Sequence, residues 1–349
     1  MKMQMSRRGF TSEFESPFEN FQTVKQSGEI RSCPVTGHVS RILPMRLKEF
    51  ARMDLQPLLD QSRSAGCPFC PENIAKKTPR FPQQFPSEDG RIVRGETFLF
   101  PNAFPYDALS AVAVVSREHF LTPAQFKPAL LLDAFAACLS YLRTAKALFP
   151  DSFQALLNWN YMPLAGAGIL HPHVQVSALQ EPTVFFRRVM EKHRGFGRGG
   201  ARSLLGEYVN QERESGERYI RQIGSWHWLT AFAPRGVYEF WGVFDEPGSI
   251  LELQEGHLAD LARGIHPILN FLECRGIQAF NMGWYSSFQE EPRGIRNWIS
   301  IIPRVNFPPL GTSDINYFNR LQDESITFVS PEKIASGLKE FLGAAPPGA

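Results

Sequence analysis

One order of predicted elements occurs twice along the chain, and this repeat constrains the fold more than any other feature. The first half predicts a strand at 108–116, a helix from 122 to about 149, and strands at 154–160 and 170–179. The second half predicts strands at 227–233 and 238–244, a helix over 255–274, and strands at 278–285 and 298–303. We therefore expect an α+β fold of two tandem units, each an antiparallel sheet with helices, formed by internal duplication.

Changes in composition predict where these units begin and end. Residues 1–30 mix Phe, Ser, Glu and Gln without an apolar run, so we expect a disordered N-terminal arm. Residues 31–191 form the predicted first unit. A segment rich in Gly, Arg and Glu at 192–218 predicts a charged connector with a short helix, and 219–349 form the second unit.

Charge and cysteine content exclude several classes of function. The 349 residues carry 37 basic and 35 acidic side chains, and this balance gives no electrostatic reason to expect a nucleic-acid partner. The longest apolar window, 129–149, contains Asp133, Arg143 and Lys146, so no membrane association is expected. Five irregularly spaced cysteines do not form a disulfide framework, and we expect a cytoplasmic protein.

The segment most informative about chemistry ends the first unit. His171, His173 and Gln175 alternate along a predicted strand, so their side chains share one face. A neutral imidazole at His173 can attack phosphorus, and the Gln175 amide can donate a hydrogen bond to phosphoryl oxygens. The alternative is that both histidines are satisfied core residues, which is the commoner situation for a single histidine on an apolar strand.

Cys67-Pro-Phe-Cys70 supplies two thiolates at a spacing that lets both sulfurs bind one metal ion. Zinc prefers four Cys or His ligands, and His119 and His171 stand at the ends of elements in the same unit. A redox pair or a chance turn is the alternative interpretation of this spacing.

Three further positions are candidates for binding a phosphate or nucleotide. The Asn160 side chain and the loop Gly166-Ala167-Gly168 can donate hydrogen bonds to phosphate oxygens, although most such glycine clusters are turns. Asn102, within Pro-Asn-Ala-Phe-Pro, is either a contact for a base or ribose or an ordinary turn residue.

Taken together, these motifs resemble the galactose-1-phosphate uridylyltransferase branch of the histidine-triad superfamily. The Cys-Pro-Phe-Cys knuckle, Asn102, Ser116-Arg-Glu-His119, Asn160 with Gly166, and His171-Pro-His-Val-Gln175 occur in the family's order over most of the chain. The resemblance implies that zinc is bound by Cys67, Cys70, His119 and His171, that His173 is the nucleophile, and that Gln175 stabilises a covalent intermediate. It also implies that Asn160 and the Gly166 loop hold the α-phosphate, and that the protein is a homodimer.

Three positions depart from the family pattern. Gly168 stands where the uridylyltransferases usually carry a serine that contacts phosphate. The second unit lacks a His-x-His pair, because its equivalent strand, 296–304, contains no histidine. The C-terminal segment 317–324 lacks the family's sugar phosphate motifs, so the acceptor is the part of the function that the sequence specifies least.

The resemblance implies a zinc-containing nucleotidyltransferase that moves a nucleoside monophosphate between a nucleoside diphosphate sugar and a sugar 1-phosphate. UMP is the nucleoside monophosphate expected first. The intermediate would be a nucleotidyl group covalently bound to His173. The alternatives are a phosphorylase or adenylyltransferase acting on a nucleotide sugar or dinucleoside polyphosphate, a nucleotide hydrolase, and a non-catalytic nucleotide-binding protein. The expected partners are a nucleotide sugar and a sugar phosphate, with no nucleic acid and no membrane.

Overall fold

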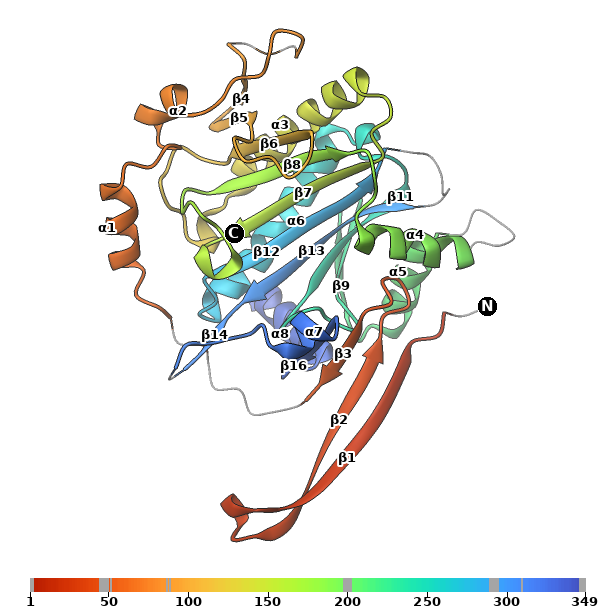
Figure 1. The fold of residues 1–349 in the computed structure, drawn as a ribbon. Coiled ribbons are helices and arrows are strands. Elements are labelled where there is room, and N and C mark those ends of the chain that lie inside the picture. Colours follow the sequence, from red (N-terminus) through yellow and green to blue (C-terminus); the bar gives the residue numbers. More distant parts are fainter. Residues whose placement is uncertain are drawn as a thin grey trace.

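A computed structural model describes residues 3–344 except 44–49, 51, 86, 88, 197–202, 289–294 and 309. Its centre is one ten-stranded sheet in the order β4-β5-β6-β8-β7-β12-β13-β11-β10-β9 (Figure 1). The strands of this sheet are β4 (Ile92–Arg94), β5 (Thr97–Pro101), β6 (Leu109–Val114), β7 (Gln154–Tyr161), β8 (His173–Leu179), β9 (Tyr219–Ile223), β10 (Trp226–Thr230), β11 (Phe240–Pro247), β12 (Ala279–Ser287) and β13 (Arg296–Arg304).

The two longest helices cover one face of this sheet. The longest are α3 (Pro128–Leu148) and α6 (Glu255–Cys274), which pack on each other and on the sheet. The remaining helices in the described ranges are α1 (Gln56–Ser64), α2 (Pro71–Lys77), α4 (Val184–Phe196), α5 (Leu204–Ser215), α7 (Tyr317–Leu321) and α8 (Pro331–Ala344). None of the helices described is both long and apolar enough to cross a bilayer.

Strand β7 shows how the sequence divides the two faces. Leu157 and Trp159 are fully buried in the main hydrophobic core with α3 and α6. Asn158 and Asn160 alternate with them and are only partly buried, because successive side chains of a strand point to opposite faces. The face of the sheet opposite α3 and α6 is therefore polar at its centre.

The two halves of the sheet have the same order of elements. In the first half β6 and α3 are followed by the neighbouring strands β7 and β8, and in the second half β11 and α6 are followed by β12 and β13. The halves meet where β7 pairs antiparallel with β12, from Phe280↔Tyr161 to Ser287↔Gln154. The predicted α+β fold with antiparallel sheets is confirmed, and the matching order agrees with the predicted duplication.

The N-terminal arm differs from the prediction of disorder. Residues 6–32 form a hairpin of β1 (Ser6–Ser16) and β2 (Gln22–Ser32), which extends from the body (Figure 1). Eleven residue pairs join the two strands, and Phe10, Phe14, Val24 and Ile30 lie on one face of the hairpin with polar residues between them, so this pairing needs no continuous apolar run. Only Glu29–Ser32 pair with β3 (Val39–Ile42), which in turn pairs in parallel with β16 (Glu324–Thr327). A two-residue pair, β14 (Asn306–Phe307) with β15 (Thr312–Ser313), completes the strands described.

The predicted connector 192–218 is largely helical where it is described. Helix α4 continues to Phe196, so it crosses the predicted boundary at 191, and α5 covers Leu204–Ser215. Apolar side chains such as Val189 and Tyr208 are buried in a second core, which explains why this charged segment is packed. Residues 197–202 lie outside the described residues.

A buried charge network fastens the hairpin base to the C-terminal helix. The Glu332 carboxylate on α8 accepts hydrogen bonds from Arg31 at 2.7 Å and from Arg218 at 2.6 Å. Burial raises the pKa of Glu332, but the bonds and charges of the two guanidinium groups outweigh it and lower that pKa from 4.5 to about 2. Ionised Glu332 thus stabilises the folded chain.

This network predicts a stability effect that depends on pH. Because the folded-state pKa of Glu332 is depressed, its contribution is fully present above pH 4.5 and is lost as the pH falls toward about 2. We expect Glu332→Gln to lower the free energy of unfolding at pH 7 by about 3 kcal/mol, and to flatten its decline below pH 4.5. Urea denaturation across this pH range measures both effects, with Glu340→Gln on the exposed side of α8 as the control. An unchanged pH profile in Glu332→Gln would refute the assignment.

Candidate active site

A cavity of about 390 Å³ lies on the face of the sheet opposite α3 and α6, over β6, β7 and β8. The side chains of β7 and β8 that point away from α3 form its floor, and the segment before α2 and the loop after β5 form its walls. It collects most of the predicted site residues. Its lining includes Phe69, Lys77, Phe100, Asn102, Tyr106, Asn160, Gly166, Ala167, Gly168, His173 and Gln175.

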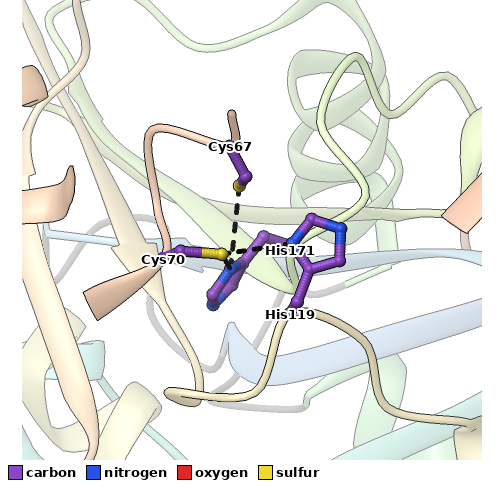
Figure 2. Close-up of side chains that lie close together, drawn as sticks. All are labelled: Cys67, Cys70, His119 and His171. Atoms are coloured by element: carbon purple, nitrogen blue, oxygen red, sulfur yellow. Dashed lines mark hydrogen bonds between the residues drawn. The ribbon is translucent and has the colours of Figure 1, made fainter. Parts of the chain in front are cut away.

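The four predicted metal ligands converge behind this cavity. The ligand atoms of Cys67, Cys70, His119 and His171 all lie within 4.8 Å of one another, and Figure 2 shows the two sulfurs facing the two imidazole rings. The Cys70 sulfur lies 3.2 Å from Nδ1 of His119 and 3.7 Å from Nδ1 of His171. The Cys67 sulfur lies 3.8 Å from Nδ1 of His171. Within the described residues, this is the one group of its kind.

These separations fit a single tetrahedral metal ion. Sulfur and nitrogen ligands at 2.0–2.3 Å from a metal stand about 3.3 to 3.8 Å apart at the corners of a tetrahedron. Nε2 of His171 donates to the Ser116 carbonyl at 2.8 Å, which leaves the Nδ1 lone pair directed at the thiols. Burial lowers the pKa of His171 to about 4, so this ring is neutral and able to act as a ligand. The donor set therefore suits a metal ion.

The pKa of Cys70 also indicates that this four-residue cluster favours a bound cation. Burial, together with the neighbouring Cys67, raises the pKa of Cys70 to about 12, so its thiolate is unfavourable in this place without a positive charge. A bound metal ion supplies that charge and favours both thiolates.

His173 begins β8 at the cavity floor and is 8% exposed. Its Nδ1–H donates to the His171 carbonyl at 2.9 Å, so Nε2 carries the free lone pair. Burial lowers the pKa of His173, and the hydrogen bond to the backbone of His171 partly offsets this. The Phe69 ring stands edge-on to His173 at 5.3 Å and to His171 at 6.3 Å, and so separates the metal cluster from the cavity. The result is a neutral imidazole of fixed orientation.

Gln175 follows on the same face of β8. Its Nε2 lies 3.5 Å from the Tyr106 hydroxyl, on the loop that rims the cavity. Tyr106 is 73% exposed, so the Gln175 amide is left able to turn toward a ligand. Both groups can donate to phosphoryl oxygens above His173.

Asn160 is held in one orientation by a residue of the second half. Nδ2 of Asn281 donates to Oδ1 of Asn160 at 2.7 Å and to the Ala165 carbonyl at 2.8 Å. Because Oδ1 of Asn160 accepts this bond, its Nδ2 faces the Gly166 loop and the cavity. Arg304 in turn donates to Oδ1 of Asn281 at 3.2 Å. The chain of bonds presents an amide donor to the cavity.

The Gly166 loop brings backbone amides to the cavity edge. Gly166 has φ +94°, and Met162, which begins the turn, has φ +72°, a value that non-glycine residues rarely adopt. Such strain is often found at functional sites. A Cβ at Gly168 would meet nothing within 4 Å, so the serine of the family pattern would fit there. The loop thus has space for phosphate oxygens at Gly168.

Asn102 is a turn residue that also lines the cavity. Its Oδ1 accepts from the Phe104 amide at 2.9 Å, which makes it a turn residue. It nevertheless lines the cavity, and its Nδ2 remains available to a ligand.

The orientation of Asn160 gives a prediction. We expect Asn281→Asp to lower the enzymatic rate about tenfold, because a carboxylate oxygen would replace the donating amide and turn the Asn160 amide away from the cavity. Steady-state kinetics measures this, with the metal content and melting temperature recorded alongside. Asn210→Asp, exposed on α5, is the control. A variant as active as the wild type would show that Asn281 does not orient Asn160.

The sequence did not identify several residues of this cavity. Phe69 lies within the cysteine knuckle and Phe100 in β5, where an aromatic residue is most simply core. Lys77, at the end of α2, has no local motif. The repeat in the sequence could have identified Asn281, since it occupies in the second half the place of Asn160 in the first. In the structure the two residues are paired in register.

Comparison with known proteins gives one clear relative by sequence. A protein of unassigned function from Archaeoglobus fulgidus is 31% identical over 315 residues, which cover 90% of this chain and 92% of the relative. No family model matches the chain.

Solved structures share the fold over nearly their whole length. An ADP-glucose phosphorylase from Arabidopsis thaliana with bound ADP-glucose has a TM-score of 0.69 at 17% identity, covering 90% of this chain and 99% of that one. A uridylyltransferase has a TM-score of 0.65 at 20% identity, covering 91% and 99%. The resemblance stated from the motifs is thus confirmed at the level of the fold.

Proposed function

Since the chain belongs to the family of the Archaeoglobus fulgidus protein and has the galactose-1-phosphate uridylyltransferase-like fold, we propose that it is a nucleotidyltransferase. One observation carries the proposal. The neutral His173 imidazole, with Nε2 free, faces a cavity rimmed by amide donors and stands in front of a four-residue metal cluster. A scaffold protein would have no need of a nucleophile prepared in this way.

The proposed reaction has two in-line steps. Nε2 of His173 attacks the α-phosphorus of a nucleoside diphosphate sugar, a P–N bond forms, and the bond from phosphorus to the bridging oxygen breaks to release sugar 1-phosphate. A phosphate oxygen of the second substrate then attacks the same phosphorus. The P–N bond breaks, and the neutral imidazole is restored.

The surrounding donors favour the charge that builds up on the phosphoryl oxygens. Gln175, Asn160 and the amides of the Gly166 loop would bind these oxygens, and each such donor is typically worth a factor of 10² to 10³ in rate. Because an amide cannot serve as a base near neutral pH, Gln175 does not activate water. This favours transfer to an acceptor over hydrolysis.

Zinc is the metal we assign to the cluster, because two thiolates and two imidazoles in tetrahedral array are its preferred ligands. Bound zinc would supply a fixed positive charge that holds the knuckle and the segment before β8 together. Cys67, Cys70, His119 and His171 would hold it. Because the His171 carbonyl accepts the hydrogen bond from Nδ1 of His173, fixing His171 also fixes the ring of His173.

A uridine nucleotide sugar is the first candidate substrate, with UMP transferred to a sugar 1-phosphate. The second candidate is phosphorolysis of an adenine nucleotide sugar, which the similarity to the ADP-glucose phosphorylase favours.

All five cysteines are free thiols, in keeping with the cytoplasm. We also expect a homodimer, and sedimentation measures its mass.

Isotope exchange tests the proposed reaction. The protein is incubated with UDP-glucose or ADP-glucose and labelled glucose 1-phosphate, without a second acceptor. A double-displacement enzyme moves label into the nucleotide sugar, because the first step is reversible. Replacing the sugar phosphate by inorganic phosphate and detecting a nucleoside diphosphate identifies a phosphorylase. Nucleotide binding with neither exchange nor phosphorolysis would contradict the proposal and favour a non-catalytic protein.

A further inference from the structure

The hairpin of β1 and β2 projects from the body of the molecule, away from β6, β7 and β8 (Figure 1). Its two strands pair with each other over eleven positions, but only Glu29–Ser32 pair with β3. A two-stranded ribbon without further support is at best marginally stable in water. The outer part of this hairpin therefore lacks the packing partner that a ribbon of its length needs.

The outer edge of β1 is open to another strand. β1 is the edge of the four-stranded sheet β1-β2-β3-β16, and the residues described provide no partner on its outer side. The strand contains no proline or lysine, and its register with β2 has no bulge. Proline, lysine and bulges are common means by which edge strands avoid pairing with another chain. The backbone of β1 is thus suited to accept one more strand.

The charges of β1 indicate which strand this is. Arg7 and Arg8 stand near its start, and Glu13 and Glu15 stand near its end. A parallel copy of β1 would place like charges together, whereas an antiparallel copy places arginines beside glutamates. The strand is therefore complementary to its own reversed copy. This property favours a second copy of the same chain over an unrelated partner.

One register pairs all eleven residues of β1, and it has Thr11 at its centre, opposite Thr11 of the second copy. In this register Arg7 lies opposite Glu15, and Arg8 lies opposite Phe14, whose ring is exposed. Opposite charges, and a cation beside an aromatic ring, both stabilise cross-strand pairs. Because the arrangement has a two-fold axis, each of these contacts occurs twice.

The tip of the hairpin carries two exposed aromatic rings. Phe18 is 93% exposed and Phe21 is 68% exposed. In the register centred on Thr11, Ser16 lies opposite Ser6, so each tip reaches the start of the other hairpin. Met5, at that start, packs against the second core. The second copy would therefore provide the exposed rings with an apolar neighbour.

The base of the hairpin is held firmly in place. Arg31 of β2 donates to Glu332 of α8, and β3 pairs with both β2 and β16. A segment that is already held in its bound conformation loses less entropy on association. The hairpin is thus prepared to pair without a change of fold.

We propose that β1 pairs antiparallel with β1 of a second copy about a two-fold axis at Thr11, so that the two four-stranded sheets become continuous. The hairpin points away from the strands below the active-site cavity, so this inference does not depend on the proposed function.

A cysteine at the axis tests the pairing in the metal-loaded protein. Thr11→Cys is made in a Cys274→Ser background, which removes an exposed thiol. Directly opposite residues have Cβ atoms about 4.5–5.5 Å apart, so a disulfide can form with little adjustment. We expect mild oxidation to give a covalent dimer on a non-reducing gel. Thr23→Cys, exposed on β2 and away from the axis, is the matched control.

Crosslinking through Thr11→Cys that is no faster than through Thr23→Cys would overturn the proposal. Sedimentation as a dimer together with that result would show that the copies associate through another face.

Charge reversal tests the antiparallel direction. Arg7→Glu with Arg8→Glu makes the four charges of β1 all negative, and Glu13→Arg with Glu15→Arg makes them all positive. Added to Thr11→Cys, each pair of changes should slow crosslinking about tenfold or more, because like charges then face each other. An equimolar mixture of the two proteins should crosslink about as fast as Thr11→Cys alone. Unchanged crosslinking in both proteins, or a mixture as slow as either one, would refute the antiparallel pairing.

Discussion

His173→Ala is expected to lower the transfer rate by about 10⁴-fold or more, because the P–N bond of the intermediate cannot form without the imidazole. The neutral ring of His173 and its fixed Nε2 are the basis of this expectation. Incubation with nucleotide sugar labelled in the α-phosphate, followed by denaturation at high pH, measures the covalent label directly. Peptide mapping should place that label on His173.

His193→Ala is the control for this experiment, since His193 is a buried histidine of α4 away from the cavity. Its label should equal that of the wild type. Gln175→Ala should still form the intermediate, about 10² to 10³ times more slowly. Label in His173→Ala equal to that of the wild type would contradict the assignment of the nucleophile.

Removal of the metal is expected to have the second large effect. Stripping the protein with a strong chelator, or Cys67→Ser, should lower the melting temperature by about 10 °C or more, because metal binding contributes directly to folding. The four ligands join the knuckle, the segment after β6 and the segment before β8, so loss of the ion separates all three. Activity should fall with stability. Calorimetric melting and elemental analysis measure the effect.

Cys274→Ser is the matched control, because Cys274 is exposed and stands apart from the cluster. It should keep the zinc content and melting temperature of the wild type. If the purified protein holds no zinc and Cys67→Ser melts normally, the metal assignment fails.

Local patterns predicted the central elements well. The helix expected from 122 is α3 at Pro128–Leu148, preceded by a short 3-10 turn at Pro123–Gln125. The proline at 128 starts a new helix, because its fixed φ suits a first turn. The strand expected at 170–179 begins only at His173, since Pro172 cannot donate to the ladder.

Contacts between distant segments were the part that local patterns could not predict. Arg31 connects the base of the hairpin at 6–32 to Glu332, some three hundred residues away in the sequence. In the same way, a cavity of about 420 Å³ combines residues near 38, 156, 185, 285 and 323, which no spacing along the sequence connects. The candidate metal ligands were easier to predict from the sequence, because the residue types that bind zinc are few and distinctive.

The pairing of β7 with β12 means that neither half of the chain is complete alone. The two halves share one continuous ladder, so a fragment ending near 191 would expose the whole edge of β7 and be prone to self-association. The Asn160–Asn281 contact lies on that seam, so such a fragment would also lose the side chain that orients Asn160.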